Sequence, residues 1–592
     1  VRVRSVSRWL NAVSVEASQA QVNSLARLPF VMNTRPVAAL AHPRPQPGPA
    51  LPAPLEKTIS TTLAYGPSVV QLSNIRVTDL HALGITGHGV LVGMIDNGFN
   101  NHRSHVALKD IPVVGEYDFI HRITSTQRQP WERPSQGNHG AATLSALAGF
   151  EEGTLIGAAY GVSVMLAKTE MDSTEVPAEE DLYVEALEWM ELSGADIVST
   201  SLGYIDWYPY DSLDGNTAIT TRAARVSASK GVLLVTAMGN ETWYRKDSAG
   251  KPIPGLTGTL IAPADADSIL AVGATHSDGE IASFSSTGPA ADDRVKPDIV
   301  AQGVAVVAAD GSTVNRFGSY NGTSLATPLV AGVAALILSA QPDLTPMQLR
   351  EAILQTALQI EDPFDPSRTA IYPNNFYGHG MVNAYEALLY HGVGVSSQPT
   401  VVPTDSGVTV SFSIISDVAL VPDSLVLMVQ SAPSGPFQPV KLEPAGQNRY
   451  SVTLPLSSDS SYPRGYVRVR DTAGRARISP LNAPDSVFVF SQFIPVNAAP
   501  AEFRLHQNFP NPFNAGTWIW FDAPGVVDVE VDIFDLLGRH IKRIYRGLSA
   551  AGANTFRWDG DSDAGRAVST GMYICRLQFA NGALSQKMVL LR

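Results

Sequence analysis

Residues 60–391 alternate short apolar runs with longer stretches of helical periodicity. Apolar runs lie at 90–95, 195–203 and 231–239. Such runs predict strands that are buried on both faces, and the segment 179–194 has the spacing of an amphipathic helix. Buried strands that alternate with helices predict an α/β domain with a mostly parallel sheet and helices on both faces.

The pattern of apolar and polar residues changes beyond residue 396. There, short runs alternate apolar and polar residues and are interrupted by Pro, Gly and Ser. This period-two pattern predicts half-buried strands, and we interpret 396–495 as an immunoglobulin-like or fibronectin-like β-sandwich. A similar pattern fills 503–592, where Val529 and Val531 alternate with Asp528. It predicts a second small β-sandwich domain.

Residues 1–41 precede a proline-rich linker at 42–59. They contain an alternating strand at Leu10–Ser14, a helix start at Ser18 with glutamine three residues later, and a second strand at Pro29–Met32. The pattern predicts part of a small α+β unit that an extended segment ties to the α/β domain.

Composition narrows the possible partners. Lys and Arg number 42 against 55 Asp and Glu, and the resulting charge of −13 opposes binding to nucleic acid or an anionic membrane.

Cys575 is the single cysteine, so neither an intramolecular disulfide nor a zinc site of several thiolates can form. No apolar window reaches the ~18 residues of a transmembrane span. The first residues lack the features of a signal peptide, and a start on Val1 predicts a fragment of a longer chain.

Four polar residues stand at the ends of apolar runs or at the starts of helices. Asp96 and Asn240 each follow a predicted strand, His139 lies in a glycine-flanked segment before a helix, and Ser324 begins a long apolar helix. Together these residue types predict a relay in which His139 takes the Ser324 proton and Asp96 fixes the imidazole tautomer. The Asn240 amide and the Ser324 N–H would stabilise the oxyanion. Each residue alone has a commoner structural role, as a helix cap or turn former, so the prediction depends on their joint occurrence.

The order Asp96, His139, Asn240, Ser324 resembles that of the subtilisin-like serine proteases, or subtilases, over about 60–391. Segments at 201–204, 261–275, 284–289, 296–303 and 378–388 also resemble that family. The resemblance implies a serine endopeptidase that hydrolyses peptide bonds through an acyl-enzyme intermediate and requires no cofactor. Structural calcium is common in the family, but no matching ligand loop assigns it here, so no metal ligand is predicted.

The resemblance also implies that two backbone walls receive the substrate, whose main chain pairs with them as an added strand. A cleft walled by the side chains of Leu202 and Met238 carries little charge, so it should favour apolar or aromatic side chains before the scissile bond. Asn97 and Ala141 depart from the family, which usually has Thr or Ser at the first position and Thr at the second. The walls are Ser201, Leu202 and Gly203, and Ala237, Met238 and Gly239.

Both ends of the chain resemble known segments. Residues 1–40 resemble the last part of a subtilase propeptide, which in the family aids folding and blocks the cleft until it is removed. Residues 503–592 resemble the C-terminal sorting domain of type IX secretion cargo, through LHQNFPNPFN at 505–514, LLGR at 536–539 and the terminal KMVLLR. These resemblances imply a secreted or cell-surface zymogen whose partners are protein or peptide substrates, its own propeptide and the secretion machinery.

The residues leave two other functions open. An α/β-hydrolase esterase is disfavoured because no G-x-S-x-G occurs and the catalytic order would be Ser, acid, His. A surface adhesin with an inactive protease domain would bind its partner through the sandwich at 396–495. Finally, the acidic residues Glu175, Glu179, Glu180 and Asp181 are interpreted as a solvated helix start rather than a metal site.

Overall fold

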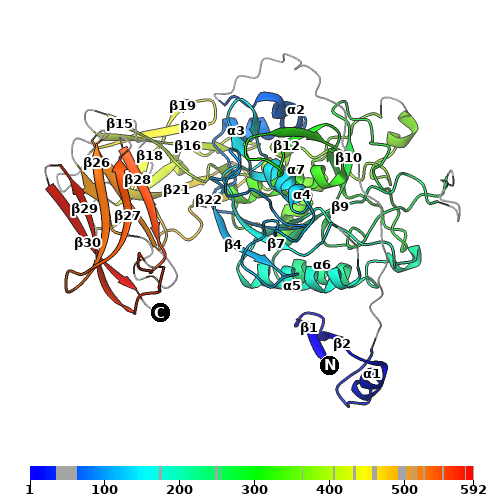
Figure 1. Ribbon diagram of the computed structural model, residues 1–592. Helices are drawn as coiled ribbons and strands as arrows, with labels where there is room; N and C mark the ends of the chain where they lie inside the picture. Colours follow the sequence, from blue (N-terminus) through cyan, green and yellow to red (C-terminus); the bar gives the residue numbers. More distant parts are fainter. Residues whose placement is uncertain are drawn as a thin grey trace. The chain divides into compact units, whose positions relative to one another are not determined.

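The computed structural model of the chain (Figure 1) describes residues 1–34, 63–172, 176–246, 251, 253, 255–362, 365–404, 407–430, 435–455, 463–490, 503–508, 511, 513, 517–524, 527–549, 552–563, 565–580 and 582–590. The linker predicted at 42–59 lies outside the described residues. The chain divides into two compact units, one formed by Val1–Pro399 and Val410–Val489, the other by Thr400–Thr409 and Phe490–Arg592.

The α/β domain is built on a parallel seven-stranded sheet with the order β11-β10-β9-β8-β3-β7-β4. Each pair of neighbouring strands in that order is parallel. The strands are β3 (Leu91–Asp96), β4 (Val113–Asp118), β7 (Ser163–Lys168), β8 (Ile197–Thr200), β9 (Leu233–Ala237), β10 (Leu270–Thr275) and β11 (Ile299–Gln302).

Helices cover both faces of this sheet, as strand β7 illustrates. Val164 and Leu166 pack into one hydrophobic cluster with α4 and α7, whereas Met165 and Ala167 pack into the other with α5 and α6. The predicted α/β fold with helices on both faces is therefore confirmed. The helices are α2 (Val69–Ser73), α3 (Val77–Ala82), α4 (Asn138–Ala148), α5 (Ala178–Leu192), α6 (Ile219–Ser229), α7 (Thr323–Ala340), α8 (Pro346–Gln355) and α9 (Ala384–Tyr390). Two short two-stranded sheets are also present. One pairs β5 (Phe150–Glu151) with β6 (Leu155–Ile156), and the other pairs β12 (Val306–Ala309) with β13 (Phe317–Tyr320).

Helix α7 is, among the described residues, the one helix that is long and apolar enough to cross a membrane by length and composition. Of its apolar window, 89% is buried within the protein. Burial of this kind is what a core helix shows, so α7 is weak support for a membrane span.

The N-terminal segment forms a hairpin and a short helix. Strands β1 (Arg2–Ser7) and β2 (Ala12–Glu16) pair antiparallel, and α1 (Gln19–Leu25) follows. The helix start predicted at Ser18 is confirmed, because Ser18 and Gln21 form a reciprocal capping box. The strand predicted at Pro29–Met32 is wrong: backbone N–H groups of Leu28 and Val31 donate to carbonyls three residues earlier, so the segment closes into turns.

The hairpin contacts α5 through two glutamates of that helix. Glu188 accepts hydrogen bonds from Ser7 Oγ (2.5 Å), Arg8 N (3.1 Å) and Trp9 N (3.2 Å). Glu185 accepts one from Ser5 Oγ at 3.0 Å. Several donors on one carboxylate fix the hairpin turn against the helix surface.

Two antiparallel sheets follow the α/β domain within the first unit. In β16 the burial pattern alternates, with Val410 and Phe412 facing the interior. One sheet contains β14 (Gly394–Val395), β16 (Gly407–Ile415), β20 (Arg449–Pro455) and β19 (Glu443–Gly446), and the other contains β18 (Gln438–Lys441), β17 (Val426–Gln430), β21 (Arg464–Arg470), β22 (Ala476–Ser479) and β23 (Phe488–Val489).

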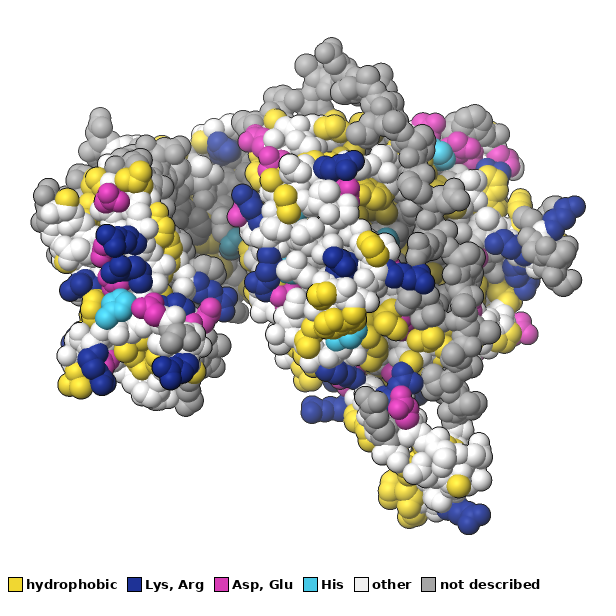
Figure 2. Space-filling view, viewed as in Figure 1, with side chains coloured by type: hydrophobic (Ala, Val, Ile, Leu, Met, Phe, Trp, Pro, Cys, Tyr) yellow, Lys and Arg dark blue, Asp and Glu magenta, His cyan; other side chains and the backbone are white. Residues whose placement is uncertain are grey.

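The second unit contains two further sheets around its own core. Val529, Val531 and Ile533 of β26 are buried, as the alternation predicts, and Cys575 lies in the same core. On the face in view in Figure 2, basic and acidic side chains are interspersed over the described residues. The strands are β24 (Arg504–Leu505), β25 (Thr517–Ala523) and β28 (Gly552–Trp558) in one sheet, and β27 (His540–Leu548), β26 (Asp528–Asp535), β29 (Gly571–Phe579) and β30 (Gly582–Leu590) in the other, while β15 spans Thr400–Thr404.

The acidic start of α5 is buried rather than solvated, which corrects the interpretation from the sequence. Glu179 accepts backbone N–H groups of Met171 and Val176, both at 3.0 Å. Glu180 is 1% exposed and accepts from Trp207 Nε1 (2.9 Å) and Tyr208 Oη (2.8 Å). Burial raises the pKa of Glu180 to about 7, although the hydrogen bonds from Tyr208 and Trp207 oppose the shift.

The shifted pKa of Glu180 predicts a loss of stability with rising pH. The folded protein holds this proton up to a pH of about 7, whereas the unfolded chain releases it near 4.5, so the free energy of unfolding falls between these values. Over this pH range the free energy of unfolding falls by about 3 kcal/mol. In a Ser324→Ala background, Glu180→Gln should flatten this part of the pH dependence of urea midpoints, because Gln keeps an acceptor but no charge. Glu191→Gln, in the last turn of α5, is the control, and identical slopes for both variants would contradict the assignment.

Candidate active site

A buried carboxylate marks the carboxyl end of β3. Asp96 is 1% exposed, and its Oδ1 accepts from His139 Nδ1 at 2.7 Å and from Asn97 N at 2.8 Å. Its Oδ2 accepts from Thr143 Oγ1 at 3.0 Å. Three donors fix the plane of the Asp96 carboxylate, which in turn orients the His139 ring.

His139 lies in the first turn of α4, where two glycines allow a close approach to β3. Gly137 has φ +80°, a left-handed conformation that favours glycine. A Cβ on Gly140 would lie 2.0 Å from the Gly98 carbonyl oxygen and 3.0 Å from Asp96 Cβ. Only glycine therefore lets the helix start reach the strand end, and Ala141 at the next position is packed against Gly311.

Asn97, which departs from the family pattern, joins three parts of the site. Its backbone N–H donates to Asp96, its Oδ1 accepts from Gly140 N at 3.3 Å, and its Nδ2 donates to Asp172 Oδ1 at 2.5 Å. The amide therefore ties the strand end, the α4 start and the loop that holds Asp172 together.

The pKa of His139 is raised above its ordinary 6.5. Burial lowers it, but the charge of Asp96, the hydrogen bond from Nδ1 to that carboxylate and the charge of Asp172 raise it more. A general base must be neutral, so activity should appear as the pH rises past this raised pKa.

We expect the acid limb of the kcat/KM profile to have its midpoint above pH 6.5. Asp172→Asn should shift that midpoint to lower pH, because one of the negative charges that stabilise the imidazolium is removed while the Asn97 contact can persist. The measurement is peptide hydrolysis between pH 5 and about 9. Asp110→Asn, an exposed site, is the control, and an unchanged limb in Asp172→Asn would show that the Asp172 charge does not act on His139.

Ser324 is the second residue of α7 and is 7% exposed. Its carbonyl accepts from Ser201 Oγ at 2.8 Å, which joins the end of β8 to the start of α7. Leu325 shares a hydrophobic cluster with Ala142 of α4, so the two helix starts that carry Ser324 and His139 are packed together. No hydrogen bond joins these two side chains among the described residues; such bonds are often long in substrate-free proteases and tighten with substrate.

Asn240 is exposed and follows β9. Its Oδ1 accepts from Thr323 N at 3.0 Å and from Thr323 Oγ1 at 3.1 Å, which fixes the orientation of the amide. A Cβ placed on Gly322 would lie 2.7 Å from Ser324 Oγ and 3.8 Å from Asn240 Nδ2. The hydroxyl and the amide nitrogen therefore face the same small volume.

The two predicted walls bury their apolar side chains. Leu202 is 7% exposed, Ala237 3% and Met238 0%, so their side chains lie in the core. Gly203 and Gly239 end the walls, and Gly239 N donates to Thr323 Oγ1 at 3.3 Å. Side chains of Leu202 and Met238 therefore do not line the cleft as the sequence interpretation supposed.

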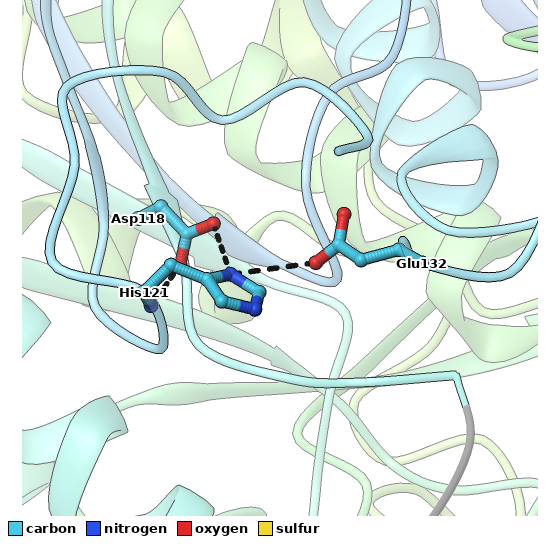
Figure 3. Close-up of side chains that lie close together, drawn as sticks. All are labelled: Asp118, His121 and Glu132. Carbon is cyan, nitrogen blue, oxygen red and sulfur yellow. Dashed lines mark hydrogen bonds and ion pairs between the residues drawn. The ribbon is translucent and has the colours of Figure 1, made fainter. Parts of the chain in front are cut away.

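A second cluster lies at the end of β4, outside this site. Figure 3 shows Asp118, His121 and Glu132, whose potential ligand atoms lie within 4.8 Å of one another. His121 Nδ1 is 2.9 Å from Asp118 and 3.5 Å from Glu132. The fully buried Lys168 Nζ lies 3.1 Å from Asp118 and also contacts Glu132, so an ammonium already supplies the positive charge that these carboxylates need.

Sequence reasoning missed Thr143, Asp172 and Lys168. Thr143 had a usable signal, since it lies four residues after His139 and so on the same face of α4. Asp172 and Lys168 carry no such sequence signal. A loop positions Asp172, and the pairing of β7 with β3 positions Lys168.

The chain matches models of three known families. The model described as the Subtilase family matches residues 87–380. A Peptidase S8 propeptide domain of Bacteroidota matches 1–48, and a FlgD Ig-like domain matches 516–582. Residues 1–48 thus form a propeptide domain that precedes the α/β domain.

Two subtilisins agree with the family match. Subtilisin E of Bacillus subtilis (strain 168) is 32% identical over 317 residues, which are 53% of this chain and 70% of that protein. Subtilisin of Bacillus pumilus is 32% identical over the same share of this chain and 97% of its own length. The crystal structure of MycP1 with its N-terminal propeptide removed is 22% identical and covers 54% of this chain and 96% of its own, with a TM-score of 0.41. The chain therefore belongs to the subtilase family, and it is a serine endopeptidase with a subtilisin-like α/β fold.

Proposed function

We propose that Asp96, His139 and Ser324 are the catalytic triad of this endopeptidase. Ser324 Oγ attacks the carbonyl carbon of the scissile peptide bond while His139 Nε2 takes its proton. His139 then gives that proton to the leaving amine, and water hydrolyses the acyl-enzyme by the same transfers in reverse. The observation that carries the proposal is the bond of 2.7 Å from His139 Nδ1 to the buried Asp96, which leaves Nε2 as the base.

Asn240 and the start of α7 supply the oxyanion site. The Asn240 Oδ1 is held by Thr323, so its Nδ2 is directed toward the volume that it shares with Ser324 Oγ. The Ser324 N–H belongs to the first turn of α7, where N–H groups have no intrahelical acceptor and the helix dipole favours negative charge. Both donors therefore act where charge develops in the transition state.

A fluorophosphonate probe tests the triad, because it forms a bond to an activated serine and leaves an ordinary serine unmodified. Peptide mass spectrometry of the labelled protein should place the adduct on Ser324. An adduct elsewhere, or none in a protein that is folded and free of its propeptide, would favour the adhesin with an inactive protease domain.

We further propose that the enzyme is secreted and that residues 503–592 form its type IX sorting domain. The support is the sequence of this segment, with LHQNFPNPFN at 505–514 and the terminal KMVLLR, together with an independent core around Val531 and Trp558. The FlgD Ig-like match is consistent with a small β-sandwich.

Deletion of residues 503–592 should spare catalysis and abolish export. All four proposed catalytic residues precede this segment, and its core belongs to a separate compact unit. The truncated chain is expressed in the native host, and activity is assayed in lysate and medium. Activity confined to the lysate supports sorting; activity in the medium would refute it, and loss from both would assign the segment a folding role.

A further inference from the structure

A third segment joins the two walls of the cleft at their base. Ala262 and Tyr204 exchange backbone hydrogen bonds of 2.8 and 3.0 Å next to the first wall. Ile261 N donates to the Met238 carbonyl oxygen of the second wall at 3.3 Å. Ile261 therefore stands between Gly203 and Gly239, with its backbone tied to both sides.

The Ile261 side chain occupies the space that both wall glycines leave open. A Cβ on Gly203 would lie 2.4 Å from Ile261 Cδ1 and 2.6 Å from its Cγ1. A Cβ on Gly239 would lie 3.0 Å from Ile261 Cγ2, and 2.8 Å from Ser286 Oγ. The two branches of one side chain thus contact both walls.

Ile261 is half-buried, unlike its neighbours Leu260 and Ala262, which are fully buried. Ile261 therefore keeps partial solvent exposure at a position between the two walls. A β-branched side chain has few alternative rotamers, and the backbone bonds to Met238 and the pairing at Ala262 restrain it further. Ile261 cannot withdraw without displacing both walls.

We propose that Ile261 closes the pocket for the side chain that precedes the scissile bond, so that the enzyme cleaves after small residues such as Gly, Ala and Ser. The inference rests on the proposed function, in which the walls at Gly203 and Gly239 receive the substrate. A phenyl or isobutyl group would have to enter the volume of the Ile261 methyl groups, and overfilling of a packed site is unfavourable. This replaces the preference for apolar or aromatic residues expected from the sequence.

The test compares two peptides that differ only in having Ala or Phe before the scissile bond. The wild-type enzyme should cleave the Ala peptide with a kcat/KM about 10- to 200-fold higher, the range that a hydrophobic pocket achieves per misfitting methylene. Ile261→Gly should reduce this ratio at least tenfold. Ile261→Val, which removes Cδ1 near Gly203, should give an intermediate ratio.

Leu256→Ala is the matched control, since Leu256 is an exposed apolar residue of the preceding segment and contacts neither wall glycine. It should leave the ratio unchanged. A wild-type preference for Phe, or equal ratios in wild type and in an Ile261→Gly enzyme that still binds the fluorophosphonate, would overturn the proposal. If no variant and no wild type binds the probe or cleaves either peptide, the proposed triad fails instead, so the two failures are distinguishable. The wild-type ratio is decisive even if Ile261→Gly does not fold.

Discussion

Ser324→Ala should lower kcat by about 10⁶, the loss found when the nucleophile of a subtilisin is removed. The fold should persist, because the change deletes one oxygen at the start of α7 and adds no bulk. The bond that Ser201 Oγ donates reaches the Ser324 backbone carbonyl and is retained. Residual activity reflects only the oxyanion donors and substrate positioning.

Peptide hydrolysis under identical conditions measures this loss, and circular dichroism and urea midpoints show whether the variant is folded. Ser339→Ala is the matched control: it removes a hydroxyl near the other end of α7, where Oγ donates to the Leu336 carbonyl. That variant should keep full activity. Turnover of Ser324→Ala within about tenfold of wild type would refute its assignment as the nucleophile.

Asp96→Asn should lower kcat by about 10⁴, the loss measured for the corresponding change in an unrelated serine protease. The carboxylate accepts from Asn97 N, His139 Nδ1 and Thr143 Oγ1. An amide offers one oxygen, so its NH2 group must face a donor or turn the His139 ring to the tautomer whose Nε2 carries the proton. That nitrogen can no longer take the Ser324 proton.

The pH profile separates this effect from simple loss of structure. Because Asp96 raises the pKa of His139, the residual activity of Asp96→Asn should have its acid limb at lower pH than wild type. Asp110→Asn provides the matched control for the same chemical change at an exposed position. A wild-type rate, or a limb that does not move, would contradict the role assigned to Asp96.

The sequence predicts the parts of this enzyme that repeat a strong local pattern. Continuous apolar runs identify the parallel strands because only strands buried on both faces tolerate them. The candidate triad can also be recognised in the sequence, because Asp96 ends a strand and His139 and Ser324 lie at the starts of helices. Their mutual placement in the structure follows from sheet order rather than from sequence spacing.

Features set by tertiary contact were not predictable in this way. Glu179 and Glu180 have the composition of a solvated helix start. In the structure both are buried: Glu180 accepts from Trp207 and Tyr208, and Glu179 accepts from two backbone N–H groups of the preceding loop. Likewise, the sequence predicts a cleft that takes apolar or aromatic side chains between the walls that end at Gly203 and Gly239. The side chain that fills it, Ile261, comes from a segment whose place between the walls depends on backbone pairing far along the chain.

The buried carboxyl of Glu180 has a consequence for how long the enzyme survives. Proteases digest their own unfolded copies, so the rate of self-digestion depends on the unfolded population multiplied by the activity of the folded one. As the pH rises from about 4.5 toward 7, the unfolded chain releases the Glu180 proton that the folded protein still holds, so the unfolded population grows. His139 becomes neutral at a pH above its ordinary 6.5, and activity is expected to grow there. Both changes act in the same direction, so we expect self-digestion to accelerate with pH as the enzyme becomes active.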